Sequence, residues 1–379
     1  MKPIHILIIP SWYQSDYKPM AGNFFREQAL SLCNAGHRVG IIHVNQYSAK
    51  LVWKHKRLLH GAKEIDDKGL KTYRMDAPRI PGMERLNSKR LARAYRKLIS
   101  TYIQEHGRPD IVHLHSFSAG EAALWIKQNY GVPYVITEHA SSLLRDRLSS
   151  HKKSIAQRVF HESSSNMAVS EQFCSFLEKQ FNQKFEYVPN FIDTSKFYLS
   201  DTKTSAFRFI NVGGMKSYKQ HSMLLKAFHK AFKNTPNVEL IIAGDGPERD
   251  SLSALIESYH LQKQVFLVGS LSRDQVIDFL HKSNVFALSS SYETFGVVLI
   301  EAMSCGLPVV STRCGGPESI VTDRRVGLLC DIEEHALSQA MREIYHNEYD
   351  SNYIRSFVES NFSEHAVVKR LEGIYEASK

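Results

Sequence analysis

The chain has 379 residues, which is too long for one ordinary hydrophobic core and predicts two domains. Hydrophobic residues make up 43% and charged residues 23%, as in globular proteins, and the apolar run at residues 4–10 is too short for a signal sequence or a membrane span. The five cysteines show no C-x-x-C spacing, so we expect reduced thiols and a cytoplasmic protein.

The formal net charge of +9 is concentrated in the first half of the chain. Residues 1–190 hold 28 basic and 16 acidic residues, whereas residues 191–379 hold 20 and 23. The segment 50–97 alone holds 15 basic and 5 acidic residues. This local excess predicts that the N-terminal half meets an anionic surface or ligand.

The chain opens with the pattern of a βαβ unit. A buried strand is predicted at residues 4–10, a helix at 25–35 and a second strand at 39–44, with Gly22 in the loop before the helix. This order is typical of a doubly wound sheet. The dinucleotide-binding G-x-G-x-x-G pattern is absent, so the unit is not predicted to bind NAD.

A basic segment follows. Residues 50–82 are polar and weakly periodic, which predicts a loop, and residues 85–103 have the apolar periodicity of an amphipathic helix. We predict contact with a membrane surface or a polyanionic acceptor, and the alternative is a solvated helix face. Seven residues are candidates for that contact: Trp53, Lys54, Lys56, Arg57, Arg90, Arg93 and Lys97.

Histidines gather near the ends of the next predicted strands, at residues 109–115 and 133–137. His113 and His115 would share one face of a strand, but no third metal ligand is evident, so a structural role is favoured over a metal site. His139 follows the second strand, where ligands collect at the carboxyl edge of parallel sheets. It is therefore a candidate functional residue.

The second half repeats the pattern of strand, glycine-rich turn and helix. Strands are predicted at residues 207–212, 238–243, 265–268 and 286–288, with a helix at 224–232. Gly213 and Gly244 follow the first two strands. The fold class is therefore α/β, with two Rossmann-like, doubly wound domains.

Residues 289–312 hold a short helix with well-marked ends. An apolar run at 297–303 is interrupted only by Glu301, Gly306 lies at the expected C-terminal cap, and Glu293 lies in the loop before the helix. Free amides at a helix start can bind an anion. A charge within such an apolar run costs several kcal/mol unless it is hydrogen-bonded.

The same segment resembles the signature S-x-E-x-F-G-x-x-x-x-E-A-M-x-x-G-x-P-V-V of retaining glycosyltransferases of family 4, which have the GT-B fold. The sequences T-E-H-A at 137–140 and V-P-N-F-I-D at 188–193 extend the resemblance over nearly the whole chain. It implies two Rossmann-like domains that face each other across a cleft. Residues 1–193 would form the acceptor side, 194–362 the nucleotide-sugar domain, and 363–379 a helix that returns to the first domain.

The resemblance also implies roles for individual residues. Glu293 would hold hydroxyls of the donor sugar, Glu301 the ribose diol, and His139 would face the centre of sugar transfer. The implied donor-binding residues are Gly22, Gly213, Lys216, Lys219, Gly244, Phe295, Gly296, Val297 and Glu301, and the implied catalytic residues are His139, Glu293 and Lys219.

The phosphate clamp departs from the family pattern. Lys219 matches the family lysine, but Gly214 stands where an arginine is expected and Gln220 replaces a glycine. We expect Lys216 to supply the missing cation. No Asp-x-Asp motif is present, and the resemblance implies no metal and no cofactor besides the nucleoside-diphosphate sugar.

The predicted reaction is transfer of a sugar to a glycan or lipid-linked acceptor with retention of anomeric configuration. We expect this reaction to belong to bacterial surface-polysaccharide synthesis, and the protein to bind peripherally to the inner face of the membrane. Three alternatives stay open: a GT-B nucleotide-sugar epimerase, a non-catalytic scaffold that binds nucleotide-sugar or a polyanion, and a nucleic-acid-binding protein. The sequence context of the two glutamates disfavours an epimerase. The presence of Glu293, His139 and Lys219 disfavours a non-catalytic scaffold. No nucleic-acid recognition motif is evident, so no nucleic-acid partner is expected.

Overall fold

The computed structural model describes residues 2–15, 21–48, 63–67, 69–144, 148–200, 202 and 204–379. The chain divides into two compact units, and each is described here by itself. Unit 1 comprises Met1–Val169, Cys174–Val188 and Val368–Lys379, and unit 2 comprises Ser170–Phe173 and Pro189–Val367.

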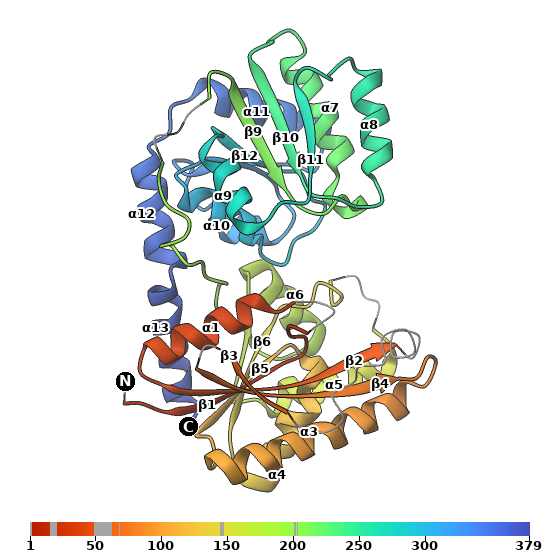
Figure 1. Ribbon diagram of the computed structural model, residues 1–379, viewed down its shortest axis with the longest axis vertical. Coiled ribbons are helices and arrows are strands. Elements are labelled where there is room, and N and C mark those ends of the chain that lie inside the picture. Colours follow the sequence, from red (N-terminus) through yellow and green to blue (C-terminus); the bar gives the residue numbers. More distant parts are fainter. Residues whose placement is uncertain are drawn as a thin grey trace. The chain divides into compact units, whose positions relative to one another are not determined.

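Unit 1 is built on an eight-stranded sheet in the order β3-β4-β2-β1-β5-β6-β7-β8 (Figure 1). All neighbours are parallel except β3, which pairs antiparallel with β4. The strands are β1 His5–Pro10, β2 Arg38–Ser48, β3 Lys63–Asp67, β4 Leu70–Arg79, β5 Ile111–His115, β6 Tyr134–Glu138, β7 Ser165–Ala168 and β8 Glu186–Tyr187. β1, β5 and β6 are buried at every position, as expected for strands covered on both faces.

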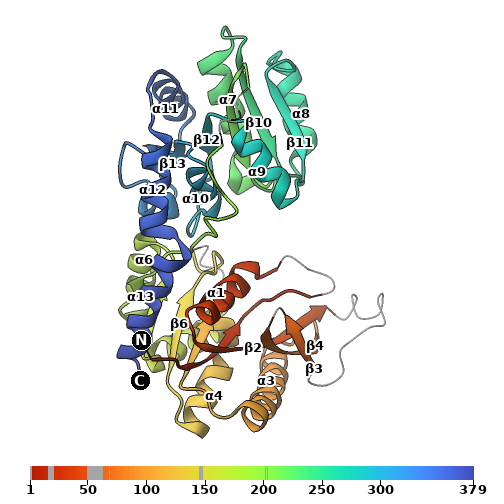
Figure 2. The ribbon, with the colours of Figure 1, turned by 60° about the vertical axis from the view of Figure 1, so that its left-hand side comes forward.

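Helices cover this sheet. α3 packs against β4 and β2 (Figure 2), and α4 packs against β5. The helices are α1 Asn23–Asn34, α3 Glu84–His106, α4 Gly120–Tyr130 and α5 Ser150–Glu162, and a 3-10 turn, η1, spans Phe117–Ala119. The helix expected at residues 85–103 is therefore confirmed, and its apolar stripe is buried at Tyr95, Leu98 and Tyr102.

The loop predicted for residues 50–82 is wrong over part of its length. Residues 63–67 form β3 and residues 70–79 form β4, and the two strands pair antiparallel; Gly69, just before β4, has φ of +87°. Charged residues interrupt β4 at Lys71, Arg74, Asp76 and Arg79, and this masks the apolar pattern that identifies a buried strand.

Unit 2 is built on a six-stranded parallel sheet in the order β11-β10-β9-β12-β13-β14. The strands are β9 Phe207–Val212, β10 Val238–Ala243, β11 Val265–Gly269, β12 Val285–Leu288, β13 Val309–Thr312 and β14 Gly327–Cys330. The helices are α7 His221–Phe232, α8 Arg249–Ser258, α9 Arg273–His281, α10 Val297–Ser304, α11 Glu334–His346 and α12 Ser351–Phe362, with 3-10 turns η2 Ser217–Lys219 and η3 Gly316–Ser319. The α/β fold class with two parallel sheets is thus confirmed.

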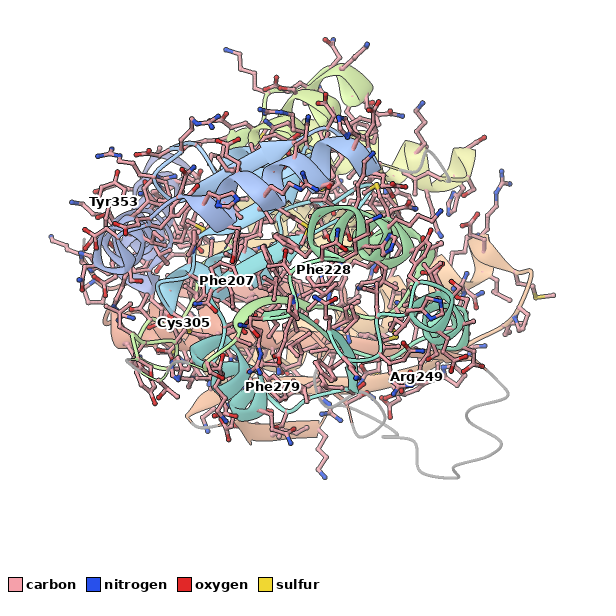
Figure 3. All side chains as sticks on the ribbon, turned by 90° about the horizontal axis from the view of Figure 1, so that it is seen from above. Phe207, Phe228, Arg249, Phe279, Cys305 and Tyr353 are labelled. Carbon is pink, nitrogen blue, oxygen red and sulfur yellow. The ribbon has the colours of Figure 1, made fainter. Side chains whose placement is uncertain are left out.

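The core of unit 2 lies between the sheet and α7, α8 and α11. Apolar side chains of β9, β10 and the three helices form one cluster, which includes Phe209, Leu224 and Phe228. Figure 3 labels Phe228, inside this cluster, and Phe207, which packs against it. Because the cluster ties helices to strands on both sides of β9, it fixes the turns that follow these strands.

Two helices belong to both units. α6 Glu171–Phe181 begins in unit 2 and continues in unit 1, and so does α13 Glu364–Ala377. In unit 1 the Tyr375 hydroxyl lies 2.7 Å from His113 Nδ1, and Glu372 Oε1 lies 2.9 Å from His37 Nε2. The final helix is therefore bonded to the inside of unit 1.

Each sheet has a point where the strand order reverses. In unit 1 it lies between β1 and β5, and in unit 2 between β9 and β12. Ligands of open parallel sheets bind outside the carboxyl ends of the strands at such points. These two edges are where a functional site is expected.

Candidate functional site

At the reversal point of unit 2 a lysine and a glutamate form an ion pair. Lys219 Nζ lies 2.5 Å from Glu293 Oε1, and each side chain is 16% exposed. Ser290 Oγ donates to the same carboxylate oxygen at 2.7 Å. Lys219 ends η2 after β9, and Glu293 lies in the loop after β12, so the two strand ends place the opposite charges together.

A glycine-rich turn lies beside this pair. Gly244 has φ of +146°, and a Cβ there would lie 2.0 Å from the carbonyl oxygen of Gly213. A Cβ at Gly213 would meet only the side chain of Lys219, at 3.6 Å. The backbones of the turns after β9 and β10 therefore pack directly against each other, and a side chain at Gly244 would prevent this contact. Gly213 also has no side chain, so its backbone lies open next to Lys219.

The predicted helix after Glu293 is confirmed as α10. Gly296 caps its start with φ of +109° and supplies no capping side chain, so the first amides, beginning at Val297, have no side-chain acceptor among the described residues. Gly306 follows the helix with φ of +79°. Phe295 is buried and packs near Phe362, which anchors the loop, and Glu301 lies partly buried in the second turn of α10.

A strap that sequence reasoning missed holds the Glu293 loop. The Glu293 amide donates to the carbonyl of Cys314, and the Gly316 amide donates to the carbonyl of Glu293, both at 2.9 Å. The Glu318 carboxylate accepts from the Gly315 amide at 2.9 Å. The C-G-G-P-E sequence at 314–318 is the signal that could have revealed this strap.

The position of Lys216 bears on the missing family arginine. Lys216 is exposed, and its Cε would lie 3.9 Å from a Cβ built at Gly214. It makes no ion pair within the part of the chain that the structure describes. Its ammonium is thus close to the glycine that replaces the arginine, and its phosphate role stays a prediction.

At the reversal point of unit 1, Gly22 has a packing reason of its own. It starts α1 with φ of +72°, and a Cβ there would lie 2.8 Å from the carbonyl oxygen of Trp12. The Trp12 ring meets the His139 ring edge-on, with centroids 6.5 Å apart. The structure therefore brings the predicted residues Gly22 and His139 together around Trp12, which sequence reasoning did not single out.

His139 belongs to a row of histidines. His115 Nδ1 lies 3.1 Å from His139 Nε2, and the His113 ring stacks on that of His115 at 4.1 Å. Burial, together with the charge of His113, lowers the pKa of His139 to about 3, so the ring is neutral at physiological pH. His139 Nδ1 is buried without a hydrogen-bond partner among the described residues. A neutral ring with one unused nitrogen can donate to, or accept from, a ligand hydroxyl.

Glu138 holds the His139 loop in place. Its fully buried carboxylate accepts from the amides of His139 and Ala140 at 2.9 and 2.8 Å, and from the amide of Phe117 at 3.0 Å. Burial raises the pKa of this carboxyl above its ordinary value, and the amide hydrogen bonds partly offset that effect. The T-E-H-A sequence contains the signal, because a buried carboxylate needs such donors.

Comparison with known proteins agrees with this geometry. The family model for glycosyltransferase family 4 matches residues 21–196, and that for glycosyl transferases group 1 matches residues 199–360. This chain belongs to glycosyltransferase family 4. The two matches fall on the two halves of the chain, and so on the two Rossmann-like sheets.

Curated relatives of this family 4 member are partial matches. The chain is 26% identical over 249 residues to a glycogen synthase of Mycobacterium tuberculosis, covering 62% of this chain and 60% of that protein. It is 28% identical over 208 residues to the N-acetyl-alpha-D-glucosaminyl L-malate synthase of Bacillus anthracis, covering 51% and 54%. The chain thus spans little more than half the length of these relatives.

Solved structures show that the family 4 chain has the GT-B fold. A sucrose-phosphate synthase of Thermosynechococcus elongatus matches with a TM-score of 0.77 and 18% identity over 98% of each chain. Anabaena Alr3699/HepE, solved in complex with UDP, matches with a TM-score of 0.74 and 17% identity over 99% of this chain and 100% of its own.

The predicted surface contacts of this family 4 member are partly described. Arg90, Arg93 and Lys97 are exposed on α3 and make no ion pair within the described ranges. Trp53, Lys54, Lys56 and Arg57 lie outside the described residues. Within the same ranges, no helix has both the length and the apolar character needed to cross a bilayer.

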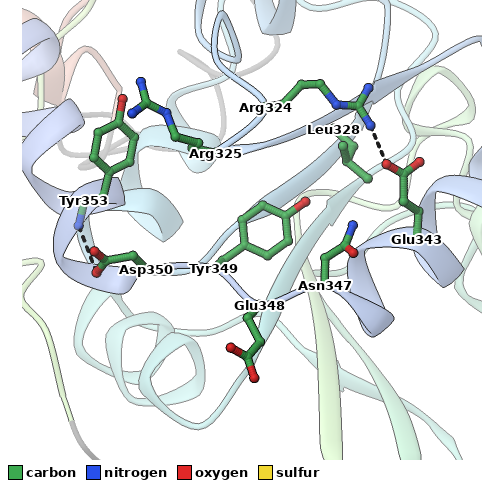
Figure 4. Close-up of a pocket in the computed structure, with 9 residues that line it drawn as sticks. All are labelled: Arg324, Arg325, Leu328, Glu343, Asn347, Glu348, Tyr349, Asp350 and Tyr353. Atoms are coloured by element: carbon green, nitrogen blue, oxygen red, sulfur yellow. Dashed lines mark hydrogen bonds and ion pairs between the residues drawn. The ribbon is translucent and has the colours of Figure 1, made fainter.

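Other features do not join the site. Among the described residues, no three His, Cys, Asp or Glu side chains lie together as metal ligands, and the five cysteines are free thiols. A pocket in unit 2 is lined by several charged residues, of which Arg324 pairs with Glu343 (Figure 4). No predicted site residue lines that pocket.

Proposed function

We propose that this chain is a glycosyltransferase that moves a sugar from a nucleoside diphosphate to an acceptor hydroxyl with retention of configuration and without a metal ion. The ion pair of Lys219 and Glu293 beside an uncovered glycine turn carries the proposal. It offers a cation to the departing diphosphate and a carboxylate to sugar hydroxyls at one strand edge. Membership of glycosyltransferase family 4 supports it.

Each residue then has a physical task. Negative charge develops on the diphosphate as the sugar leaves, and Lys219, with Lys216 and the amides at Gly22 and at the start of α10, stabilises that charge. Glu293 orients the sugar, and Glu301 accepts from the ribose. Lys219 and the helix start take the place of a metal. His139, neutral at working pH, bonds a hydroxyl at the reacting centre.

Thermal unfolding with UDP, GDP, ADP and their common sugars, with and without EDTA, tests the donor site. Ligand at about 100 times its dissociation constant stabilises the fold by roughly 2.7 kcal/mol, which raises the melting temperature. We expect one nucleotide class to act, EDTA to leave the shift intact, and Lys219→Ala or Glu301→Ala to abolish it.

The controls are Lys226→Ala on α7 and Glu257→Ala on α8, two exposed residues outside the site. A shift that EDTA removes would refute metal independence. Conversion of the free nucleotide-sugar without an acceptor would indicate an epimerase instead. The anomeric proton in the NMR spectrum of the product decides retention.

We also propose an acceptor that is a glycan or a lipid-linked glycan of bacterial surface polysaccharide, met by a chain that docks peripherally on the inner face of an anionic membrane. The exposed basic row Arg90, Arg93 and Lys97 supports this, since each basic residue near such a surface contributes about 1 kcal/mol.

Sedimentation with phosphatidylcholine vesicles, with and without phosphatidylglycerol, tests the docking. Replacing Arg90, Arg93 and Lys97 together by glutamine should abolish binding to the anionic vesicles. The same replacement of Lys226, Lys230 and Lys233 in unit 2 should leave that binding unchanged. Equal binding to neutral vesicles would refute an electrostatic contact.

A further inference from the structure

Two adjoining cavities in unit 1 form one groove. The first, of about 310 Å³, lies at the carboxyl ends of β1 and β2, and its lining includes Trp12, Tyr47 and Tyr95. The second, of about 210 Å³, contains Arg79, Glu84 and Lys152. Both are lined by Gln46, Leu91 and Ser118, so the two cavities lie side by side. We name them the aromatic half and the charged half.

The aromatic half starts beside the candidate site. Trp12 lines it and also contacts the ring of His139. Aromatic faces next to the hydroxyls of Ser11 and Ser15 and the amide of Asn45 suit a sugar ring, which presents apolar faces and a polar rim. An acceptor seated there would extend toward the charged half when it is longer than one sugar.

The charged half has an excess of positive charge. Arg79, at the end of β4, is exposed and makes no ion pair among the residues described here. Lys152 lies in the first turn of α5, and this turn contains no acidic residue. Since a helix start favours acidic residues and disfavours lysine, this placement costs stability that a bound anion would restore.

The carboxylate of Glu84 already contacts the residues at the start of α5. Glu84 Oε2 accepts from Ser149 Oγ at 2.7 Å, and Glu84 Oε1 lies 3.6 Å from Lys152 Nζ. Ser149 and then Lys152 lower the pKa of the Glu84 carboxyl. The groove therefore stabilises negative charge at the start of α5, while Arg79 remains uncompensated.

We propose that the charged half binds a phosphate group on the acceptor, held by Arg79 and Lys152, while the sugar to be extended lies in the aromatic half. The inference rests on the proposed function and names the substrate class: a phosphorylated glycan, in which the phosphate belongs either to a soluble sugar phosphate or to a lipid carrier. Glu84 competes with this phosphate and weakens its binding.

Lysine acetylation measured by mass spectrometry tests the site on the full-length chain. Inorganic phosphate should slow acetylation of Lys152 relative to chloride at equal ionic strength, by about threefold at twice its dissociation constant. Lys153, exposed and outside the groove, is the internal control. Lys219 reports the donor site in the same sample, because UDP should protect it.

Two variants carry opposite expectations. Arg79→Gln should abolish the protection of Lys152 by phosphate, and Glu84→Gln should lower the phosphate concentration needed for it. Arg108→Gln, at an exposed position of unit 1 that lines neither cavity, is the matched control. Melting temperatures confirm that each variant is folded.

Protection of Lys152 that is equal in phosphate and chloride, or unchanged by Arg79→Gln, overturns the inference. Such a result leaves the proposed function standing when UDP still protects Lys219, and the two failures are therefore distinguishable. Glucose 1-phosphate and phosphatidylcholine vesicles with undecaprenyl phosphate then assign the source of the phosphate. Protection by the first indicates a soluble sugar phosphate, and protection by the second, but not by plain vesicles, a lipid carrier.

Discussion

Lys219 and Glu293 hold their charges at a largely enclosed position because each neutralises the other. Removing one partner leaves the other charge buried and unpaired, which costs more than removing both. We therefore expect Lys219→Met alone to destabilise the chain more than Lys219→Met combined with Glu293→Gln, with a coupling free energy of about 1–3 kcal/mol.

Urea unfolding of the two single variants and the double variant measures this coupling. The exposed pair of Asp278 on α9 and Lys282, which follows the helix, is the control, and we expect its coupling to be at most about 0.5 kcal/mol. If the free-energy losses of the two single variants simply add in the double variant, Lys219 and Glu293 do not stabilise each other and the prediction is wrong.

We expect His115 to act through His139. The contact between their ring nitrogens fixes the orientation and tautomer of His139, so His115→Phe should lower kcat by up to about 100-fold through misplacement of that ring. His115→Asn, which keeps a polar group near this position, should recover part of the rate.

Kinetics with saturating donor, as a function of pH, separate positioning from folding. A positioning role moves the pH profile and kcat, whereas a purely structural loss lowers the active fraction at every pH. His161→Phe, on the exposed face of α5, should change neither quantity.

The buried histidines make unit 1 sensitive to acid. Burial lowers the pKa of His113 to about 3, whereas the unfolded chain has its ordinary value of about 6.5. The stability due to neutral His113 is therefore fully present above pH 6.5 and is lost as the pH falls toward the folded pKa, by up to about 1.4 kcal/mol per pH unit.

Unfolding by urea at pH 7.5 and pH 5.5 checks this sign. His113→Phe should be less stable than the parent at both values, because it loses its bonds to Tyr375 and Thr137, but its stability should fall less between them. An identical fall in both proteins would show that His113 does not titrate on unfolding.

At the scale of elements, the turns after β9 and β10 hold the backbone on which the proposed donor site is built. Gly244→Ala should destabilise unit 2 by at least about 3 kcal/mol, because the new methyl group would meet the Gly213 carbonyl. Gly36→Ala is the matched control, since Gly36 also has positive φ, +93°, but open space around it.

Thermal unfolding compares the two variants. The control should lose only the backbone strain, on the order of 1 kcal/mol. Equal losses would mean that the turn yields, and that the close packing of Gly213 and Gly244 does not constrain the donor site.

Sequence patterns predicted the elements best where burial is complete. The predicted bounds of β9 and β10 match the observed ones because their mainly apolar runs end at glycines, and α10 is predicted because Gly296 and Gly306 mark its ends. The hairpin of β3 and β4 is not predicted because β3 is a polar edge strand and charged residues interrupt the apolar pattern of β4. Long-range pairing is not predicted either: the contact of Lys219 with Glu293, the Glu318 strap and the bonds of Glu138 join residues that no local periodicity relates.

At the scale of the whole molecule, unit 1 includes the final segment of the chain. Tyr375→Phe should destabilise unit 1 by about 1–3 kcal/mol, because His113 Nδ1 loses a buried partner. Deletion of Val368–Lys379 should unfold it. The control is Tyr198→Phe, a half-exposed tyrosine of unit 2.

Hydrogen exchange read by mass spectrometry resolves the two units. Peptides of β1, β5 and β6 should lose protection in Tyr375→Phe, while peptides of β9 and β10 keep theirs. Equal loss in both sets would show that the two units unfold as one.

The placement of Val368–Lys379 also sets an order of events on the ribosome. All of unit 2 is translated before unit 1 receives its last helix. At roughly 5–20 residues per second, the 179 residues Pro189–Val367 take about 10–35 s to make, and during this time His113 and His37 still lack their α13 partners. We therefore expect unit 1 to remain incomplete, and open to aggregation, for longer during synthesis than unit 2.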